Sequence, residues 1–344
     1  MKKTQCALIM AGGRGTRFWP KSTEKKPKQF LNLIGDKTMI QLTIDRITKL
    51  IPIENVFVCT SSEYKNLVRE QLPTLNERNI IIEPLGMNTA PCILLSAMYI
   101  NQIYNDANLV VLPSDHIINN DEKFIDVLLE GMKFIEENIG IVTIGIVPNR
   151  PETGYGYIKV KKIEKNLIPV EKFVEKPDID HALEYLKTQK YLWNAGMFLF
   201  NTNYIINEYK YLVPEMYNIL KKVPIIKDCN YFDVLNKIYP LCEKISFDYA
   251  IMEKTRHAYV IPSELGWDDI GTWNSIERYL EKDENKNIIK GNIILEQCNN
   301  CIVYGNDKKI ILLNVNDIFC IDSDDLIVIG NREKINEIIN YRNK

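Results

Sequence analysis

Short apolar runs rich in β-branched residues alternate with helix-forming stretches over the first half of the chain. The strand-like runs are CALIM (6–10), NVFVCT (55–60), NIIIEP (79–84), NLVVLPSD (108–115) and GIVTIGIV (140–147). Helical spacing of apolar residues marks residues 38–51 and 122–138 between them. Continuous apolar strands are typical of a sheet buried on both faces, and strand–helix alternation requires parallel strands joined by crossovers. We therefore expect an α/β fold with a mainly parallel, mixed sheet.

The pattern changes twice further along the chain. Residues 155–200 contain strand-like pieces broken by Gly and Pro, which we expect to form an insertion that builds one wall of a pocket. Beyond residue 284, short apolar strands separated by Asn, Asp and Gly turns recur at intervals of roughly ten residues. A helical pattern at 332–342 closes the chain. We predict a main domain over 1–284 and a small C-terminal β-rich, β-helix-like domain over 285–344 that ends in a helix.

Charge and cysteine content disfavour several classes of protein. The formal net charge is −2, so nothing global favours binding to nucleic acid or to an anionic membrane. No stretch reaches the roughly 18 apolar residues of a membrane span. The eight cysteines lie mostly in apolar runs, which indicates reduced core residues of a cytoplasmic protein. Cys298 and Cys301 are the only pair with CxxC spacing, and a metal site there is the minor alternative.

A glycine-rich, basic loop, MAGGRGTRFWPKSTEKKPKQF (10–30), follows the first predicted strand. Glycine lets the backbone approach a ligand closely, and successive N–H groups form a concavity that binds anions. A phosphate site is therefore expected, with a plain tight turn as the alternative. The dinucleotide fingerprint fails because Phe18 stands where its third glycine belongs. A Walker A loop fails because no GK[ST] stands at the required spacing.

The loop resembles the signature of the sugar-nucleotide pyrophosphorylase family, GGxGxRxxPxSxxxPK, and its Trp19 and Gln29–Phe30 resemble the mannose-1-phosphate guanylyltransferase (GDP-mannose pyrophosphorylase) branch. Further motifs follow in the order of that family: IIEPLGMNTAP (81–91), LPSDH (112–116), TGYGYI (153–158), VEKFVEKPD (170–178), WNAGMFLF (193–200), SFDYAIMEKT (246–255) and GWDDIGTW (266–273). Together they span most of residues 5–275. One departure is Met87, because the family usually has Arg at that position.

The resemblance implies that residues 1–284 form a Rossmann-like nucleotidyltransferase catalytic domain. The implied enzyme makes GDP-mannose and pyrophosphate from GTP and α-D-mannose 1-phosphate, by metal-assisted in-line attack on the GTP α-phosphate. The sugar phosphate is already ionised at neutral pH, so positioning and charge neutralisation suffice without a general base or a protein nucleophile. Two alternatives stay open: an enzyme that uses dTTP or UTP with another hexose 1-phosphate, and a catalytically silent, nucleotide-sugar-sensing regulatory subunit.

The resemblance also implies roles for individual residues. The expected catalytic residues are Arg17, Lys28, Asp115 and Asp269. The expected nucleotide-binding residues are Ala11, Gly12, Gly13, Gly15, Glu83, Asn88 and Ser114. The expected sugar-phosphate-binding residues are Gly154, Gly156, Glu175, Lys176, Asn194 and Gly196.

The expected cofactor is Mg²⁺, held by Asp115 and Asp269, with Asp268 as the less favoured ligand. His116 is expected to be structural or to contact a metal-binding residue rather than the metal itself. The resemblance places Glu83 at the base, where a carboxylate, which only accepts hydrogen bonds, can take both donors of guanine, N1–H and the 2-amino group. The alternative is that Glu83 caps the next helix or pairs with a lysine. The expected partners are GTP and mannose 1-phosphate, without nucleic acid or membrane, in a homodimer. Because no histidine cluster follows residue 284, no fused phosphomannose isomerase activity is expected.

Overall fold

The computed structural model describes residues 3–164 and 166–342. The strands are β1 (Thr4–Met10), β2 (Val56–Ser61), β3 (Ile80–Glu83), β4 (Ala107–Pro113), β5 (Ile141–Ile146), β6 (Tyr157–Lys159), β7 (Ile168–Pro169), β8 (Lys172–Val174), β9 (Tyr191–Asn201), β10 (Ala258–Ser263), β11 (Ile288–Lys290), β12 (Ile293–Glu296), β13 (Ile302–Tyr304), β14 (Ile310–Leu313), β15 (Ile318–Asp322) and β16 (Ile327–Asn331). The α-helices are α1 (Met39–Ile47), α2 (Lys65–Gln71), α3 (Thr89–Tyr104), α4 (Asp121–Glu137), α5 (Ile179–Thr188), α6 (Thr202–Leu212), α7 (Pro214–Leu220), α8 (Tyr231–Ile238) and α9 (Trp273–Ile276). Short helical turns are η1 (Thr16–Phe18), η2 (Lys28–Phe30), η3 (Ile53–Asn55), η4 (Ser62–Tyr64), η5 (Glu77–Asn79), η6 (Tyr239–Leu241), η7 (Asp248–Met252) and η8 (Arg332–Tyr341).

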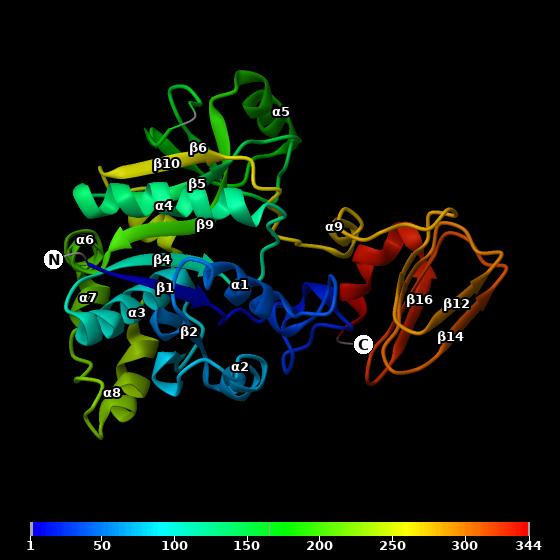
Figure 1. Ribbon diagram of the computed structural model, residues 1–344, viewed down its shortest axis with the longest axis horizontal. Coiled ribbons are helices and arrows are strands. Elements are labelled where there is room, and N and C mark those ends of the chain that lie inside the picture. Colours follow the sequence, from blue (N-terminus) through cyan, green and yellow to red (C-terminus); the bar gives the residue numbers. More distant parts are fainter. Residues whose placement is uncertain (1–2, 165, 343–344) are drawn as a thin grey trace. The chain divides into compact units, whose positions relative to one another are not determined.

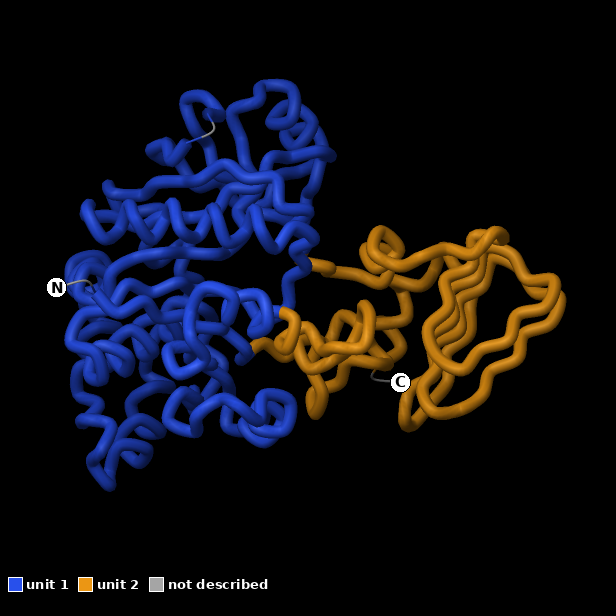
Figure 2. Tube along the Cα trace, viewed as in Figure 1, with its two compact units in different colours: residues 1–12, 43–268 blue, residues 13–42, 269–344 orange. Residues whose placement is uncertain are grey.

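The chain divides into two compact units (Figure 2). Unit 1 comprises the residues up to Gly12 and Thr43–Asp268, and unit 2 comprises Gly13–Leu42 and the residues from Asp269 onward. The glycine-rich loop therefore leaves unit 1 at Gly12. The domain boundary near residue 284 stays a prediction.

Unit 1 is built on one large sheet with strand order β3-β2-β1-β4-β9-β5-β10-β7, which β6 and β8 extend beside β9 (Figure 1). The neighbours β3-β2-β1-β4 are all parallel, as are β5 and β10. Strand β5 is buried along its whole length, which explains its unbroken apolar sequence. The predicted α/β fold with a mainly parallel, mixed sheet is confirmed.

Strand β9 corrects the expectation that residues 155–200 form a separate insertion. It lies inside the main sheet, antiparallel to both β4 and β5. Its second half is fully buried, from Met197 to Asn201. Among the described residues of that region, β6 and β8 lie off the main strand order, and β6 pairs with the start of β9.

The C-terminal part of unit 2 is a short β-helix-like coil, as expected. Strands β11, β13 and β15 stack in parallel, and β12 and β14 form a second parallel pair. The interior holds Cys298, Cys301, Val303 and Cys320. The thiol of Cys298 donates to backbone carbonyls at 3.3 Å, so the CNNC segment is a turn of this coil, filled by thiols that act as small apolar groups. The final helical pattern is the 3₁₀-helix η8.

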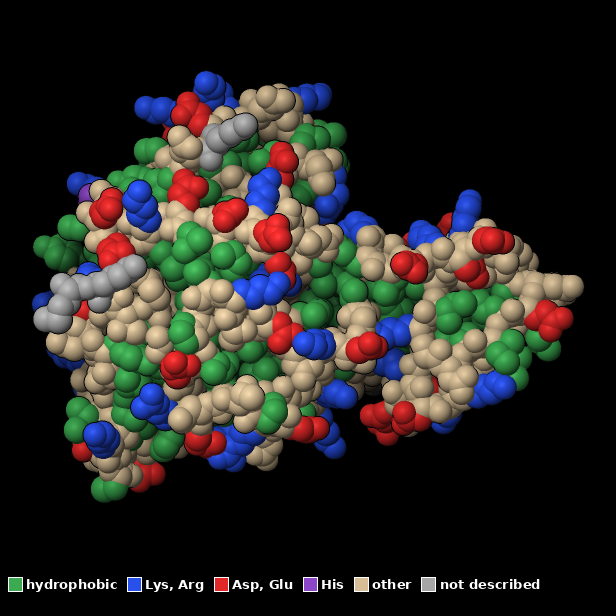
Figure 3. Space-filling view, viewed as in Figure 1, with side chains coloured by type: hydrophobic (Ala, Val, Ile, Leu, Met, Phe, Trp, Pro, Cys, Tyr) green, Lys and Arg blue, Asp and Glu red, His purple; other side chains and the backbone are tan. Residues whose placement is uncertain are grey.

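Two surface properties agree with the composition. Positive and negative side chains are interspersed on the face shown in Figure 3. Within residues 3–164 and 166–342, no helix is both long and apolar enough to cross a membrane.

Candidate active site

Four neighbouring parallel strands of unit 1 end at the same edge of the sheet. Ala11 and Gly12 follow β1, Glu83 ends β3, and Ser114 and Asp115 follow β4. The Ala11 N–H donates to Cys59 O at 2.8 Å and the Ser114 N–H to Met10 O at 3.2 Å, which ties these strand ends together. In open α/β sheets this edge is where ligands bind. The fold thus gathers most of the predicted nucleotide residues of unit 1 in one place.

Asp115 lies at this edge with its side chain 30% exposed. The Nε2 atom of His116 is 3.9 Å from its Oδ1 atom. Trp267 donates its indole N–H to His116 Nδ1 at 3.1 Å and packs edge-on against the imidazole. His116 is thus held between the Trp267 indole and the Asp115 carboxylate.

The predicted sugar residues converge on the start of β9. The Asn194 N–H donates to Gly156 O at 2.9 Å, and Tyr157 pairs with Val174, the residue before Glu175. Gly196 has φ +64°, and a side chain there would start 3.9 Å from Pro113, two residues before Asp115. Gly156, Glu175, Asn194 and Gly196 are therefore neighbours beside the strand that leads to Asp115.

Gly154 and Lys176 flank this group. Gly154 N–H donates to the Glu152 carboxylate at 3.0 Å, and both Gly154 and Lys176 are exposed. Both predicted sugar-phosphate residues therefore lie on the surface of unit 1.

The side chain of Asn194 is engaged within the protein. Its Nδ2 donates to Asp248 Oδ1 at 2.7 Å, and its Oδ1 accepts the Gly196 N–H at 3.0 Å. Burial raises the pKa of Asp248, which opens the π-helix η7. π-Helical turns are frequent at functional sites. Sequence reasoning included Asp248 in the SFDYAIMEKT motif without giving it a role, because a π-turn leaves no local sequence signal.

Unit 2 brings together the rest of the glycine-rich loop and its basic residues. Gly15 has φ +45°, and a side chain there would collide with the Lys28 backbone N at 2.7 Å, so only glycine fits. Gln29 donates to Gly13 O at 2.8 Å. Lys28 is buried, and its Nζ donates to the backbone oxygen of Asp269.

Arg17 and Asp269 meet at Gly271. A Cβ atom on Gly271 would lie 3.0 Å from Arg17 Nη1 and 3.3 Å from Asp269 Oδ1. A side chain at position 271 would crowd both the guanidinium and the carboxylate. Unit 2 thus places together Gly13, Gly15, Arg17, Lys28 and Asp269 from two distant stretches of sequence.

Asp268 and Asp269 have different surroundings. Asp268 is 1% exposed, accepts from the Tyr155 hydroxyl at 3.3 Å and pairs with Arg150 Nη2 at 3.5 Å. Asp269 is only half-buried. The Asp268 carboxylate therefore contacts Tyr155 and Arg150 in the interior of unit 1. Arg150 was not singled out in the sequence, because its partner lies more than a hundred residues away.

Glu83 is buried, with 3% of its surface exposed. Tyr239 donates its hydroxyl to Glu83 Oε1 at 2.9 Å. Burial raises the Glu83 pKa to about 7, against the opposing effects of hydrogen bonds from Tyr239 and Cys92. A Cβ on Gly12 would lie 2.9 Å from Glu83 Oε2, so the first part of the loop passes directly over this carboxylate.

Asn88 and Met87 follow Glu83 at the entrance to α3. Asn88 caps α3, with its side chain accepting the Thr89 N–H at 2.8 Å, and it adopts φ +71°. Met87 packs into the main hydrophobic core. The position where the resembling family usually has Arg therefore contributes an apolar core contact here.

Comparisons with known proteins agree over nearly the whole chain. A family model described as nucleotidyl transferase matches residues 6–286. The mannose-1-phosphate guanylyltransferase RfbM of Salmonella typhimurium strain LT2 is 39% identical over 338 residues, which cover 96% of this chain and 70% of that protein. The alginate biosynthesis protein AlgA of Pseudomonas aeruginosa strain PAO1 is 35% identical, covering 96% of this chain and 70% of that protein. The crystal structure of mannose-1-phosphate geranyltransferase from Thermus thermophilus superposes with a TM-score of 0.85 at 30% identity, covering 100% of both chains.

Proposed function

This chain belongs to the nucleotidyl transferase family, and from that premise we propose that it is a mannose-1-phosphate guanylyltransferase. It is an enzyme that makes GDP-mannose, and the substrates are GTP and α-D-mannose 1-phosphate. The observation that carries this function is the 39% identity to such an enzyme across 96% of the chain. The arrangement of unit 1 supports this function. One edge of its sheet carries predicted nucleotide, metal and sugar-phosphate residues side by side, namely Gly12, Ser114, Asp115 and Asn194.

The family is typically metal-dependent. Asp115 and Asp269 fit Mg²⁺, because each is a partly exposed carboxylate and Mg²⁺ prefers oxygen ligands while keeping several waters. When bound, the ion neutralises phosphate charge. Arg17 and Lys28 would neutralise the remaining charge of the triphosphate, and the amides from Gly12 to Gly15 would bind its phosphates. Glu175, Asn194 and Lys176 would orient the hexose and its phosphate for in-line attack.

The decisive assay measures pyrophosphate release with each of the four common NTPs and with several hexose 1-phosphates. We expect GTP with mannose 1-phosphate to give the highest kcat/KM. Preference for dTTP or UTP with another sugar would show that the enzyme is a dTTP- or UTP-dependent hexose-1-phosphate nucleotidyltransferase instead. Absence of turnover with every pair, together with binding of GDP-mannose, would favour a regulatory subunit.

Glu83→Gln is expected to lower kcat/KM for GTP far more than for ITP, which lacks the 2-amino group. The substitution replaces one acceptor with a donor that faces the donors of guanine. A site built on hydrogen bonds rejects a mismatched partner strongly, by as much as roughly 10⁴–10⁵-fold. Steady-state kinetics with both nucleotides measure the effect. Equal losses for GTP and ITP would show that Glu83 does not contact the 2-amino group. Unchanged kinetics would show that it does not contact the base at all.

A homodimer formed through the β-helix-like part of unit 2 is the quaternary structure we propose. Strands β12 and β14 present exposed apolar side chains on their outer face, among them Ile294, Ile311 and Leu313. Burial of such a face stabilises association by about 25 cal/mol per Å² before the costs of binding. We expect Ile311→Glu with Leu313→Glu to convert a dimer into a monomer in sedimentation velocity. Phe232→Glu, at an exposed position on α8, serves as the control. A wild-type monomer would exclude the dimer.

A further inference from the structure

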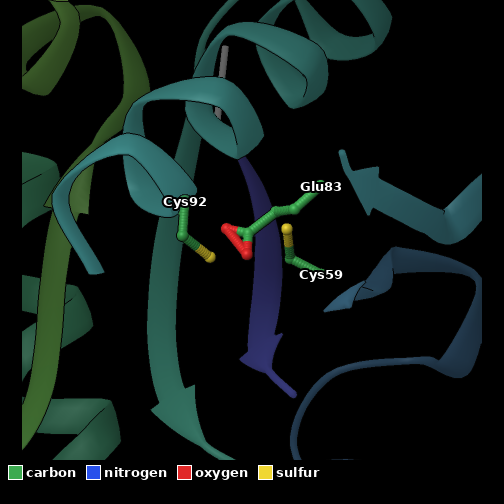
Figure 4. A group of neighbouring side chains, drawn as sticks. All are labelled: Cys59, Glu83 and Cys92. Atoms are coloured by element: carbon green, nitrogen blue, oxygen red, sulfur yellow. The ribbon is translucent and has the colours of Figure 1, made fainter. Parts of the chain in front are cut away.

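The carboxylate of Glu83 lies in a buried cluster with two thiols and a phenol. Cys59 comes from β2, Cys92 from the first turns of α3, and Tyr239 from η6. Figure 4 shows the carboxylate between the two sulfur atoms, and the ligand atoms of Glu83, Cys59 and Cys92 lie within 4.8 Å of one another. All four side chains are buried. Three elements thus converge on the one carboxylate that the proposed function places at the nucleobase.

The hydrogen bonds around this carboxylate are directional. Tyr239 donates to Oε1 at 2.9 Å, and Glu83 also accepts a hydrogen bond from Cys92. The Oε2 atom lies on the side of Gly12, 2.9 Å from the position that a Cβ there would take. Two donors therefore hold the carboxylate while Oε2 lies against the glycine-rich loop.

A thiophilic metal ion is the other chemistry that two thiols and a carboxylate suggest. It would require deprotonated thiols. The hydrogen bond with Cys59, together with burial, raises the pKa of Cys92 well above its ordinary value. Neutral thiols that donate hydrogen bonds fit the cluster better than thiolates that bind a metal.

We propose that Tyr239 and Cys92 are positioning residues for guanine recognition, which keep the Glu83 carboxylate ionised and aimed at the base of GTP. This inference rests on the proposed function. A protonated Glu83 would present one donor and one acceptor to the two donors of guanine, and one contact would become repulsive. Loss of either donor hydrogen bond favours the protonated form, because hydrogen bonds to a carboxylate stabilise its charge.

The proposal predicts a pH-dependent affinity for GTP. Burial raises the Glu83 pKa to about 7, so the carboxylate gains a proton as the pH falls through neutrality. The titratable groups that face it are Cys59, Cys92 and Tyr239, and burial raises the Tyr239 pKa well above its usual range. Recognition of GTP should therefore weaken below about pH 7, and removing a donor should move this loss to higher pH.

Tyr239→Phe is the first test, with kcat/KM measured for GTP and ITP from about pH 6 to about pH 9. We expect a loss of at least about tenfold for GTP at neutral pH, mainly through KM, a smaller loss for ITP, and recovery at the alkaline end. Tyr209→Phe is the matched control, because Tyr209 is a buried tyrosine of the same core that donates to Ala90 O at 2.7 Å. It should leave the pH profile unchanged.

Cys92→Ala and Cys92→Ser give an independent test if Tyr239→Phe does not fold. Alanine removes the donor and should shift the GTP profile to higher pH, whereas serine keeps an O–H donor and should restore it. Losses that are independent of pH and equal for GTP and ITP, or identical profiles for the two Cys92 variants, would overturn the proposal. Stoichiometric Zn²⁺ binding by the wild type that disappears in Cys92→Ala would also overturn it. If the wild-type protein released no pyrophosphate with GTP, the proposed function itself would be wrong, whatever the roles of Tyr239 and Cys92.

Discussion

Replacing Asp115 or Asp269 with alanine is expected to reduce turnover by at least about 10³-fold while the fold remains intact. Each carboxylate is proposed to hold Mg²⁺, and its loss leaves phosphate charge without compensation. Both side chains are partly exposed, so their removal opens no cavity in the core. Pyrophosphate release measured over a range of Mg²⁺ concentrations, together with thermal unfolding, checks both parts of the expectation.

Two further variants sharpen this test. Asp126→Ala, at an exposed position on α4, should change neither activity nor Mg²⁺ dependence. Asp268→Asn should lower stability, because it weakens the buried contacts with Tyr155 and Arg150, and should leave the apparent Mg²⁺ constant near that of the wild type. Near-normal rates for both alanine variants would disprove the metal assignment. If Asp268→Asn raised the Mg²⁺ requirement and Asp269→Ala did not, Asp268 would be the metal ligand in place of Asp269.

Arg17→Ala is expected to cost roughly 3–4 kcal/mol of transition-state stabilisation, a loss of about 10²–10³ in kcat/KM. The guanidinium is proposed to neutralise charge that develops on the triphosphate. Its neighbours in unit 2 are Gly271 and Asp269, which places it beside the proposed metal ligand. Single-turnover and steady-state kinetics separate a loss in the chemical step from a loss in GTP binding.

Arg14→Ala is the matched control for Arg17. Arg14 lies in the same loop, its side chain is 74% exposed, and its ion pair with Glu24 is 4.0 Å long. An exposed pair of this length contributes little, so we expect the variant to behave like the wild type. A loss below tenfold for Arg17→Ala, or an equal loss for Arg14→Ala, would show that Arg17 does not contact the reacting phosphates.

Local sequence was sufficient to predict the main parallel strands and to mark the glycine-rich loop as a candidate phosphate site. Strands β2, β4 and β5 are nearly continuous buried runs, and Gly15 adopts φ +45° within the glycine-rich loop. These features depend on a few adjacent residues, so they leave a clear pattern. The carboxyl ends of parallel strands meet at one edge of a sheet, so the same strands also bring Glu83 and Asp115 to that edge.

Long-range contacts explain what the sequence did not reveal. The sequence predicts that Glu83 accepts from guanine, but it does not reveal the hydrogen bond from Tyr239, which is 156 positions away. Arg150 reaches Asp268 across a comparable separation, and no local pattern encodes either pair. Met87 in the core shows the same limit, because an apolar residue in a polar motif does not reveal whether it lines the site or packs beneath it.

The placement of β9 between β4 and β5 has a consequence for synthesis on the ribosome. Strand β4 can pair with β1 once it has left the ribosome. Its other edge pairs with β9, in which Phe198 is the partner of Val111, so this edge stays unpaired until Phe198 has been synthesised. At about 5–20 residues per second, that interval lasts roughly 4–17 s. During it the nascent sheet presents an apolar, unpaired edge, the kind of surface that recruits strands from other chains. We therefore expect this edge of β4 to be open to wrong pairing while residues 114–198 are being translated.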